Sequence, residues 1–187
     1  MAIQISDRPD ATLVRDAKDG HADAFNALVR RWERKIYTFL VYLTGRQEDA
    51  FDMCQEVFLS SYRHLDQLKD PDKFPQWLFR IARNTAHSHS RVTRDGERET
   101  SLEGIERFEN SSTTKVGDAG IWERGELKIL VEKALARLPL EQREAIVLKF
   151  YQGFKLTEIA EIQGCPLSTA KTRMYTGFEQ MRKFIEG

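Results

Sequence analysis

Apolar residues recur at steps of three and four over most of this chain, and that spacing places them on one face of a helix. The first stripe covers residues 23–43 and is followed by Gly45, which is expected to end the helix. A second stripe covers residues 51–65, a third runs from 74 to 82, and a shorter helix is expected around 13–18. The residues expected to be buried on the second helix are Phe51, Cys54, Val57, Phe58, Ser61, Tyr62 and Leu65. No alternating strand pattern occurs, so the sequence predicts an all-α fold.

The helical period is lost between residues 93 and 120, where four glycines and the polar run 110–114 occur. Between Thr93 and Trp122 there are four basic and seven acidic residues, although the whole chain holds 29 of each. Such a composition is typical of a flexible segment. The sequence therefore predicts two small helical domains, residues 1–92 and 121–187, joined by an acidic flexible linker over residues 93–120.

Composition also limits the classes of function. The longest apolar runs are too short to cross a bilayer, so a cytoplasmic protein is expected. A formal net charge of zero argues against indiscriminate binding to nucleic acid. Cys54 and Cys165 are far apart and are expected to be reduced and partly buried.

We expect neither a cofactor nor catalysis. The chain has no glycine-rich phosphate loop and no nucleophile with a base at a recognisable spacing. His87 and His89 lie two residues apart and so point to different faces of a helix, which disfavours a metal site. They are expected to be solvated or to face DNA.

Residues 156–175 fit a helix-turn-helix motif. Thr157 is expected to cap a first short helix, Gly164 to supply the turn, Leu167 to fill the corner and Ser168 to cap the second helix. The core-facing residues would be Ile159, Ala160, Ile162, Ala170, Met174, Met181 and Phe184. Polar residues near the start of the second helix suit recognition of the major groove, which favours DNA binding over a solvated bundle helix.

The first domain contains an acidic face and a mixed basic and aromatic face. Asp49, Asp52 and Glu56 lie on neighbouring turns of one helix, and their spacing fits either a solvated surface or a docking surface. The third helix carries aromatic, basic and amide groups, a combination that suits unpaired bases and phosphates. For Trp77 a core position is the favoured alternative. These residues are Phe74, Trp77, Phe79, Arg80, Arg83, Asn84, His87 and Arg91.

Taken together and in order, five blocks of this sequence resemble the extracytoplasmic-function sigma factors of the sigma-70 family. The blocks are residues 23–29, 49–58, 74–84, 138–148 and the helix-turn-helix. The resemblance covers almost the whole chain outside the linker. It implies a protein that binds core RNA polymerase and directs promoter-specific initiation of transcription, without chemistry of its own.

The resemblance also implies roles for particular residues. Those expected to dock on the clamp helices of the largest polymerase subunit are Asp49, Asp52, Gln55, Glu56 and Phe58. Those expected to bind the minus-ten element are Lys69, Asp70, Lys73, Phe74, Trp77, Arg80, Arg83, Asn84, His87 and Arg91. Those expected to read the minus-thirty-five element are Ser168, Thr169, Lys171, Thr172, Arg173, Tyr175 and Thr176. The linker would run through the active-site and RNA-exit channels of the polymerase.

Some positions depart from the family pattern. Ser88 stands where the family often has Asp, and Thr176 and Phe178 stand where basic residues are usual. We therefore expect weak DNA binding by the free protein, with the polymerase supplying most of the affinity. The family also implies an anti-sigma factor as a partner, which could hold the protein near the membrane.

One alternative remains open from the residues alone: a free-standing helix-turn-helix regulator whose first domain binds a ligand or a partner. It would require a dimer interface and a palindromic site, and the sequence shows no spare apolar helix for a dimer.

Overall fold

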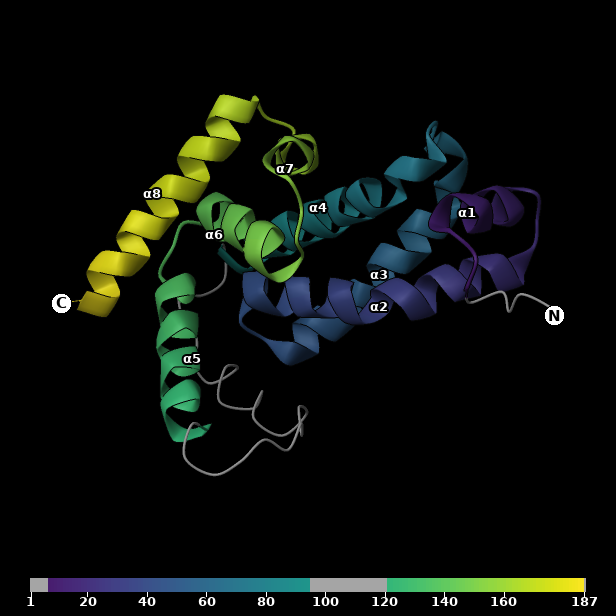
Figure 1. Cartoon of the computed structure of the whole chain (residues 1–187). Coiled ribbons are helices and arrows are strands. Elements are labelled where there is room, and N and C mark those ends of the chain that lie inside the picture. Colours follow the sequence, from purple (N-terminus) through teal and green to yellow (C-terminus); the bar gives the residue numbers. More distant parts are fainter. Residues whose placement is uncertain (1–6, 95–120, 187) are drawn as a thin grey trace.

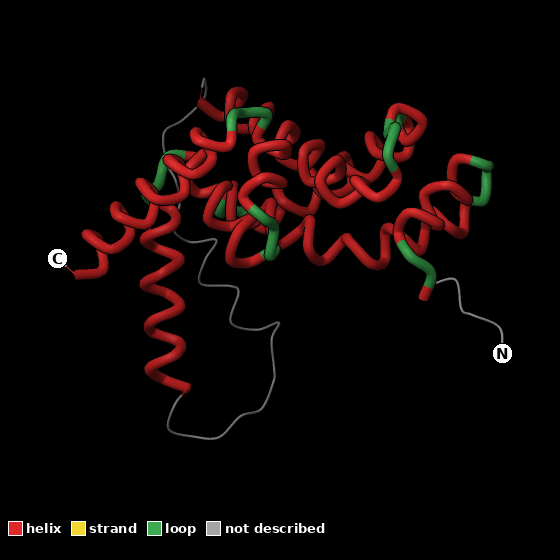
Figure 2. The backbone as a smooth tube through the Cα atoms, turned by 45° about the horizontal axis from the view of Figure 1, so that its top comes forward, coloured by secondary structure: helices red, strands yellow, loops and turns green. Residues whose placement is uncertain are grey.

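The computed structural model describes residues 7–94 and 121–186, with side chains over 7–90 and 128–186. Regular structure within these ranges is entirely helical (Figure 2), as predicted. The first half contains α1 (Asp10–Lys18), α2 (Ala22–Thr44), α3 (Gln47–Arg63), the short turns η2 (Leu65–Gln67) and η3 (Pro71–Lys73), and α4 (Phe74–Arg94). The second half contains α5 (Ile121–Ala136), α6 (Leu140–Ile146), the π-helical turn η6 (Val147–Tyr151), α7 (Leu156–Gln163) and α8 (Leu167–Glu186). The predicted linker lies outside the described residues, except for its first two positions, which belong to α4.

Helix α2 is the centre of the first half, where it contacts α1, α3 and α4. It ends as predicted at Gly45, which adopts the left-handed conformation with φ 71° and donates its N–H to Val41 O at 2.8 Å. Most residues of the stripes form the core; completely buried members are Leu13, Leu28, Ile36, Phe39, Leu40 and Leu78. Phe79, which was expected on the mixed basic and aromatic face, is also completely buried. Each such side chain contributes about 1.5–3 kcal/mol relative to exposure.

The expected burial of α3 is wrong at two positions. Phe51 and Tyr62 are each 57% exposed, although the ring of Tyr62 meets that of Phe25 edge-on at a centroid distance of 5.0 Å. The buried face of α3 is instead made by Ala50, Met53, Cys54, Val57, Phe58 and Ser61. Because successive residues of a helix are about 100° apart, Phe51 and Tyr62 turn away from that face.

The second half holds its helix-turn-helix through two glycines with different roles. Gly164 adopts φ 62° between α7 and α8, which confirms the predicted turn. A Cβ atom on Gly177 would lie only 2.8 Å from Ile146 Cδ1, so this glycine permits close contact between α8 and α6. The predicted core residues of the motif are buried or partly buried: Ile159, Ala160, Ile162, Ala170, Met174, Met181 and Phe184.

The predicted cap of α7 is wrong. The helix begins at Leu156, and the backbone N–H of Lys155 donates to the Glu158 carboxylate at 2.7 Å. A glutamate in the third helical position therefore stabilises the start of the helix. Thr157 lies inside the first turn and is exposed.

The start of α8 also differs from the expectation. Pro166 O accepts the backbone N–H of Ala170 at 3.1 Å, so the helix begins before Ser168 rather than being capped by its side chain. Leu167 is 37% exposed and does not fill the corner. Since proline fixes its own φ, it sets the direction of the chain two residues earlier than a cap at Ser168 would.

The two halves pack directly on one another, with α7 beside α4 and α6 against α2 (Figure 1). The ring of Phe79 on α4 is 5.2 Å from that of Phe39 and 5.0 Å from that of Phe154, which belongs to the second half. Tyr42 and Tyr151 form another ring pair between the halves, at 4.4 Å. The buried residues of both halves consequently form one continuous cluster.

Candidate polymerase and nucleic-acid surfaces

Helix α3 presents an acidic surface. Asp52, Gln55 and Glu56 are exposed and Asp49 is half-buried. Arg46 lies 3.8 Å from the Asp49 carboxylate and His89 lies 3.2 Å from that of Glu56, so both pairs are solvent-screened surface contacts. Phe58, the remaining residue of the predicted docking set, is buried, and it supports the helix instead of offering a contact in this structure.

An apolar stripe lies on the same helix and was missed by the sequence analysis. Phe51, Leu59 and Tyr62 are each more than half exposed, and their spacing of eight and three residues places them on one side of α3. Large apolar groups exposed in a row mark a surface for another protein. The sequence offered no signal to separate them from the buried stripe, since their period is also helical.

The turn before α4 and the outer face of α4 remain open to solvent. Asp70 organises the turn, because its carboxylate accepts the backbone N–H of Asp72 at 3.1 Å. Exposed members of the predicted minus-ten set in this part of the chain are Lys69, Asp70, Lys73, Arg80 and Asn84. Phe74 is completely buried and Trp77 partly buried against the core, so Phe74 offers no stacking surface here. The side chain of Arg91 lies outside the described residues.

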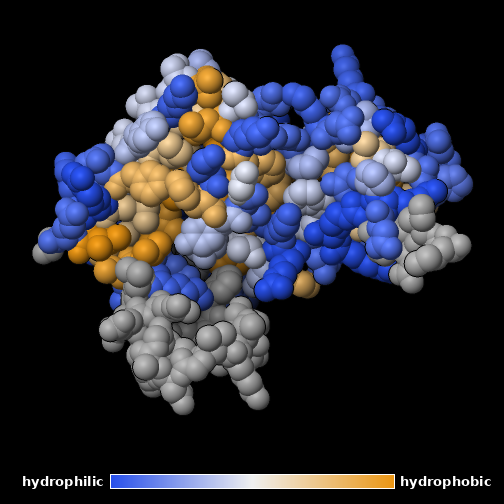
Figure 3. All heavy atoms as spheres, viewed as in Figure 1, coloured by the Kyte–Doolittle hydropathy of each residue, from blue (hydrophilic) through white to orange (hydrophobic). Residues whose placement is uncertain are grey.

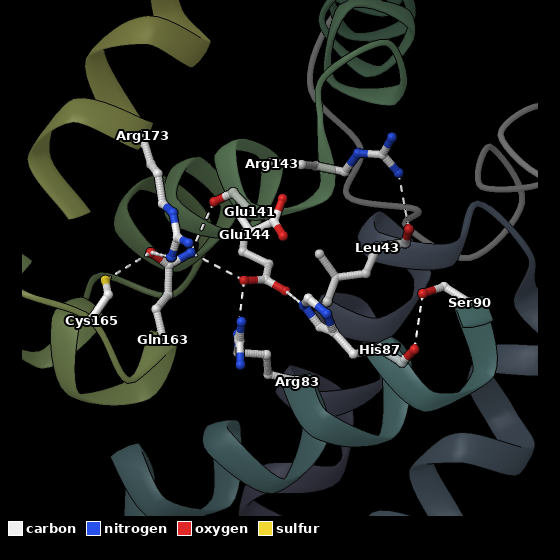
Figure 4. A network of polar contacts seen from close by, with 10 residues as sticks. All are labelled: Leu43, Arg83, His87, Ser90, Glu141, Arg143, Glu144, Gln163, Cys165 and Arg173. Carbon is white, nitrogen blue, oxygen red and sulfur yellow. Dashed lines mark hydrogen bonds and ion pairs between the residues drawn. The ribbon is translucent and has the colours of Figure 1, made fainter. Parts of the chain in front are cut away.

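The opposite face of α4 meets a buried carboxylate (Figure 4). Glu144 of α6 has 0% side-chain exposure; its Oε2 accepts from Arg83 Nε at 3.0 Å, and its Oε1 contacts His87 Nε2. Gln163 Nε2 donates to the same carboxylate at 3.1 Å. Arg83 and His87 are thus both paired with Glu144. The expectation that His87 is solvated or faces DNA is therefore not met in this structure.

Two further contacts connect α7 with the start of α4. Lys73 Nζ donates to both carboxylate oxygens of Glu161 at 2.8 Å, and this hydrogen bond raises the pKa of Lys73. Gln76 Nε2 donates to Glu158 Oε1 at 2.8 Å. Neither glutamate could be given a role from the sequence, because nothing in a surface-helix pattern indicates which distant residue it meets.

Arg143 is a buried structural cation that joins two backbone segments through three carbonyl groups. Its Nη1 donates to Leu43 O at 2.9 Å, and its Nη2 donates to Leu138 O at 3.1 Å and to Ala136 O. Burial lowers the pKa of Arg143, and the neighbouring Glu144 charge opposes that effect. Arg143 therefore satisfies carbonyls at the ends of α2 and α5.

The predicted recognition helix keeps most of its polar residues outward. Its exposed residues from the minus-thirty-five set are Ser168, Lys171, Thr172, Tyr175 and Thr176. Thr169 and Arg173 are half-buried, and Arg173 Nη1 donates to Gln163 Oε1 at 3.2 Å. Tyr175, at 61% exposure, offers an open ring beside Lys171 and Thr172.

The second half also carries exposed apolar side chains: Phe150, Tyr151, Leu167, Tyr175 and Ile185. Figure 3 shows apolar surface gathered over the part of the molecule where α5, α6 and α8 lie. Phe150 contacts Phe178 edge-on at 4.9 Å, which leaves part of its ring free.

Neither cysteine forms a disulfide. Cys54 is buried, and burial together with the Glu33 charge raises its pKa to about 11, whereas Cys165 is half-buried. Within the described ranges, no three His, Cys, Asp or Glu side chains gather into a set able to hold a metal ion. No helix among the described residues is long and apolar enough to traverse a membrane.

Comparison with protein families gives two matches in chain order. Residues 28–95 match Sigma-70 region 2 and residues 128–181 match Sigma-70 region 4. The first range includes the acidic surface and α4, and the second includes the helix-turn-helix. The fold and these surfaces therefore define a protein of the sigma-70 class.

Individual relatives narrow the class. The chain is 32% identical to the ECF RNA polymerase sigma factor SigW of Bacillus subtilis, over 91% of this chain and 93% of the relative. It is also 32% identical to the ECF RNA polymerase sigma-E factor of Escherichia coli K12, over 95% and 94%. It is 28% identical to the RNA polymerase sigma-H factor of Pseudomonas aeruginosa, over 97% and 96%. The chain belongs to the extracytoplasmic-function (ECF) RNA polymerase sigma factors.

Solved structures share the fold. CnrH, solved in complex with the cytosolic domain of CnrY, matches with a TM-score of 0.69 and 22% identity over 95% of this chain and 97% of that one. The sigma factor RpoE of Bartonella quintana, solved with the anti-sigma factor NepR, matches with a TM-score of 0.64 and 22% identity over 87% and 96%. Both likenesses extend across the two halves.

Proposed function

We propose that this protein binds core RNA polymerase and directs it to promoters that carry minus-ten and minus-thirty-five elements. The observation that carries the proposal is the order of two surfaces in one chain: an exposed acidic and apolar helix face in region 2, and an outward polar recognition helix in region 4. A sigma factor needs both, because one must hold the polymerase and the other must hold duplex DNA. Residues 1–92 and 121–187 would act as the two binding domains, with 93–120 as an acidic linker through the polymerase channels.

Polymerase docking is assigned to α3. Asp49, Asp52, Gln55 and Glu56 provide charge and hydrogen-bond acceptors, and Phe58 supports them from within the core. The exposed apolar stripe of Phe51, Leu59 and Tyr62 extends this surface. An apolar centre with a charged rim fits a protein partner that carries basic and apolar side chains, such as the clamp helices of the largest subunit.

Minus-ten binding is assigned to the turn before α4 and to α4 itself. Lys69, Arg80 and Asn84 are open to solvent, so they can meet the phosphates and bases of a separated strand. Holding a base out of the stack costs a few kcal/mol, which stacking and backbone contacts offset. The other members proposed for this role are Asp70, Lys73, Phe74, Trp77, Arg83, His87 and Arg91.

Minus-thirty-five reading is assigned to the first turns of α8. Lys171, Thr172, Tyr175 and Thr176 point outward near the amino end of the helix, where a recognition helix lies deepest in the major groove. Ser168, Thr169 and Arg173 flank them, and Arg173 also steadies the turn through Gln163.

The polymerase carries out the chemistry in this proposal, and the chain needs no cofactor. An anti-sigma factor is proposed as a further partner, because a sigma factor of similar fold was solved with one. Such a partner could hold an otherwise cytoplasmic protein near the membrane.

In vitro transcription on a genomic promoter library with purified core polymerase tests the function. Asp52→Arg should abolish the sigma-dependent transcripts, because it reverses a charge at the centre of the docking face. Asp66→Arg is the matched control: it makes the same charge change on an exposed residue outside that face. Duplex DNA binding by the chain alone, with no polymerase binding, would contradict the proposal in favour of a free-standing regulator.

A further inference from the structure

The turn that connects α3 with α4 is attached to the core at Leu68. This residue lies between the short turns η2 and η3, and its backbone is extended, with φ −72° and ψ 102°. Leu68 and Leu65 are 5% and 4% exposed, so their side chains anchor the turn. A buried carbonyl oxygen outside a helix needs a donor from elsewhere in the protein. Leu68 O accepts a hydrogen bond from Lys18 Nζ at 2.5 Å.

Lys18 belongs to the last turn of α1, a helix that lies beside the connection between α3 and α4 (Figure 1) and contacts both η2 and η3. Lys18 is half-buried, and it reaches a carbonyl 50 residues further along the chain. A hydrogen bond from a charged donor is stronger than one from a neutral donor. Lys18 therefore connects α1 with the turn at the point where the turn leaves the core.

Helix α1 is itself held firmly on α2. Leu13 and Val14 in the middle of α1 are completely buried. At its start, the carboxylate of Asp10 accepts a hydrogen bond from Trp32 Nε1 at 3.0 Å and pairs with Arg31. The start of α1 is thus fixed to α2 and its end to the turn before α4. The helix is a support from which its last lysine can hold that turn.

Two exposed residues of the turn, Lys69 and Asp70, follow Leu68 directly. Asp70 orders the next part of the turn: its carboxylate accepts the N–H of Asp72 at 3.1 Å, and its carbonyl oxygen accepts the N–H of Lys73 at 3.0 Å. These bonds fix the shape of η3, but they do not fix its direction relative to the core. That direction is set where the chain leaves the core, at the carbonyl of Leu68.

We propose that Lys18 is a positioning residue for minus-ten recognition, which directs Lys69 and Asp70 toward the promoter strand by holding Leu68 O. The inference rests on the proposed function, because it takes the turn before α4 as part of the minus-ten surface. Lys18 acts through the backbone of the turn and need not touch DNA itself. Groups that are held in place before binding avoid the entropy cost of being ordered on the strand. The direction of the turn therefore affects how well the correct bases are distinguished from others.

The expected loss of promoter selectivity follows from the contribution of one hydrogen bond to an ordered turn. A hydrogen bond to a charged group, at the lower end of its usual strength, corresponds to about a tenfold change in an equilibrium constant. Without Lys18, transcription from promoters with the correct minus-ten bases should fall by up to that factor. A promoter with a substituted base gains little from the position of the turn, so its transcription falls less. Discrimination between the two promoters should drop by about threefold to tenfold.

The test uses full-length protein and core RNA polymerase on one promoter recovered from the genomic library. Its minus-ten and minus-thirty-five bases are replaced one at a time, and transcripts are counted by sequencing. Lys18→Met removes the donor but keeps a long unbranched side chain. Arg15→Met is the matched control, because it removes a positive charge from an exposed residue of the same helix. Lys18→Arg keeps a charged donor on a side chain of at least equal length.

We expect Lys18→Met to lose about threefold to tenfold of its selectivity at minus-ten positions and to stay within about twofold of wild type at minus-thirty-five positions. Arg15→Met should stay within about twofold at both elements, and Lys18→Arg should recover most of the loss. Unchanged minus-ten selectivity in Lys18→Met would overturn the proposal. So would an equal loss at both elements, an equal loss in Arg15→Met, or a Lys18→Arg protein as unselective as Lys18→Met.

Two further measurements separate the remaining outcomes. Circular dichroism checks the fold; if Lys18→Met unfolds, Lys18→Gln replaces it, with Arg15→Gln as its control, because glutamine is uncharged and shorter but still polar. Amide hydrogen exchange over residues 65–73 should be faster in the Lys18 variant than in wild type and unchanged in α8, and equal exchange in the turn would contradict the proposal. If wild type initiates but the Lys18 variant is equally selective, only the positioning role is lost. Wild-type protein that does not initiate loses the proposed function itself.

Discussion

Replacing the buried Arg143 by methionine tests how the second half is held together. Arg143→Met keeps a long unbranched side chain and nearly the same helix propensity, so the change removes little except the guanidinium. Its loss leaves Leu43 O, Ala136 O and Leu138 O without the donors that they have in the native protein. The first of these carbonyls is near the end of α2, the second belongs to the last residue of α5, and the third follows α5 by two residues.

The expected loss in the free energy of unfolding follows from these three hydrogen bonds. A hydrogen bond to a charged group contributes about 1.5 kcal/mol at the lower end of its range, so the three sum to roughly 4–5 kcal/mol. Removing the cation also recovers part of the free energy that its burial consumes, as its lowered pKa and the unpartnered Arg143 Nε atom indicate. We expect a net loss of about 3 kcal/mol in the free energy of unfolding.

Urea denaturation followed by circular dichroism measures this loss. Arg182→Met is the control, because Arg182 lies on the exposed face of α8, where its ion pairs with Glu179 and Glu186 are solvent-screened. Arg143→Lys should also destabilise, because a single ammonium group cannot reach carbonyls that the planar guanidinium joins. An Arg143→Met protein as stable as the control would refute the reasoning, since it would mean that these carbonyls find other donors.

Three further results are expected. Gly164→Ala should lower the free energy of unfolding by about 1 kcal/mol in the same urea assay, because φ 62° is unfavourable for a residue with a Cβ. With iodoacetamide at pH 8, Cys165 should react well before Cys54, whose pKa of about 11 leaves about one thiol in a thousand ionised; Cys54→Ser should leave the fast phase unchanged. Lys171→Ala should reduce the slope of log affinity against log salt by about 1 for holoenzyme on promoter duplex, if this lysine contacts a phosphate.

The sequence predicted the helices well because each carries its own apolar period. The stripe of α2 and its end at Gly45 are local properties, and so is the turn at Gly164. The errors arose where a local pattern admits two solutions: Phe51 fits a helical period but falls outside the buried face of α3. Thr157 and Ser168 are good capping residues, yet Lys155 and Pro166 are the residues that directly precede the two helices.

The surface residues were less predictable for a different reason. Exposure of Asp52 and Lys171 follows from their place on a helix, whereas the partner of Arg83 depends on how two distant segments meet. Glu144 lies 61 residues away from it in the chain, and its neighbours in α6 give no sign that it is completely buried. Contacts between separately predicted units cannot be read from the period of either one.

The aromatic junction at Phe79 has a consequence for how the free chain unfolds. This ring completes the core of the first half through Phe39 and that of the second through Phe154, so neither half keeps its full packing if the other melts. Free protein should therefore show one cooperative thermal transition, and the slowest amide protons of α4 and α6 should exchange at similar rates. A partner that separates the two halves would divide this cooperative unit into two less stable ones. The free energy needed for that separation would lower the apparent affinity for the partner.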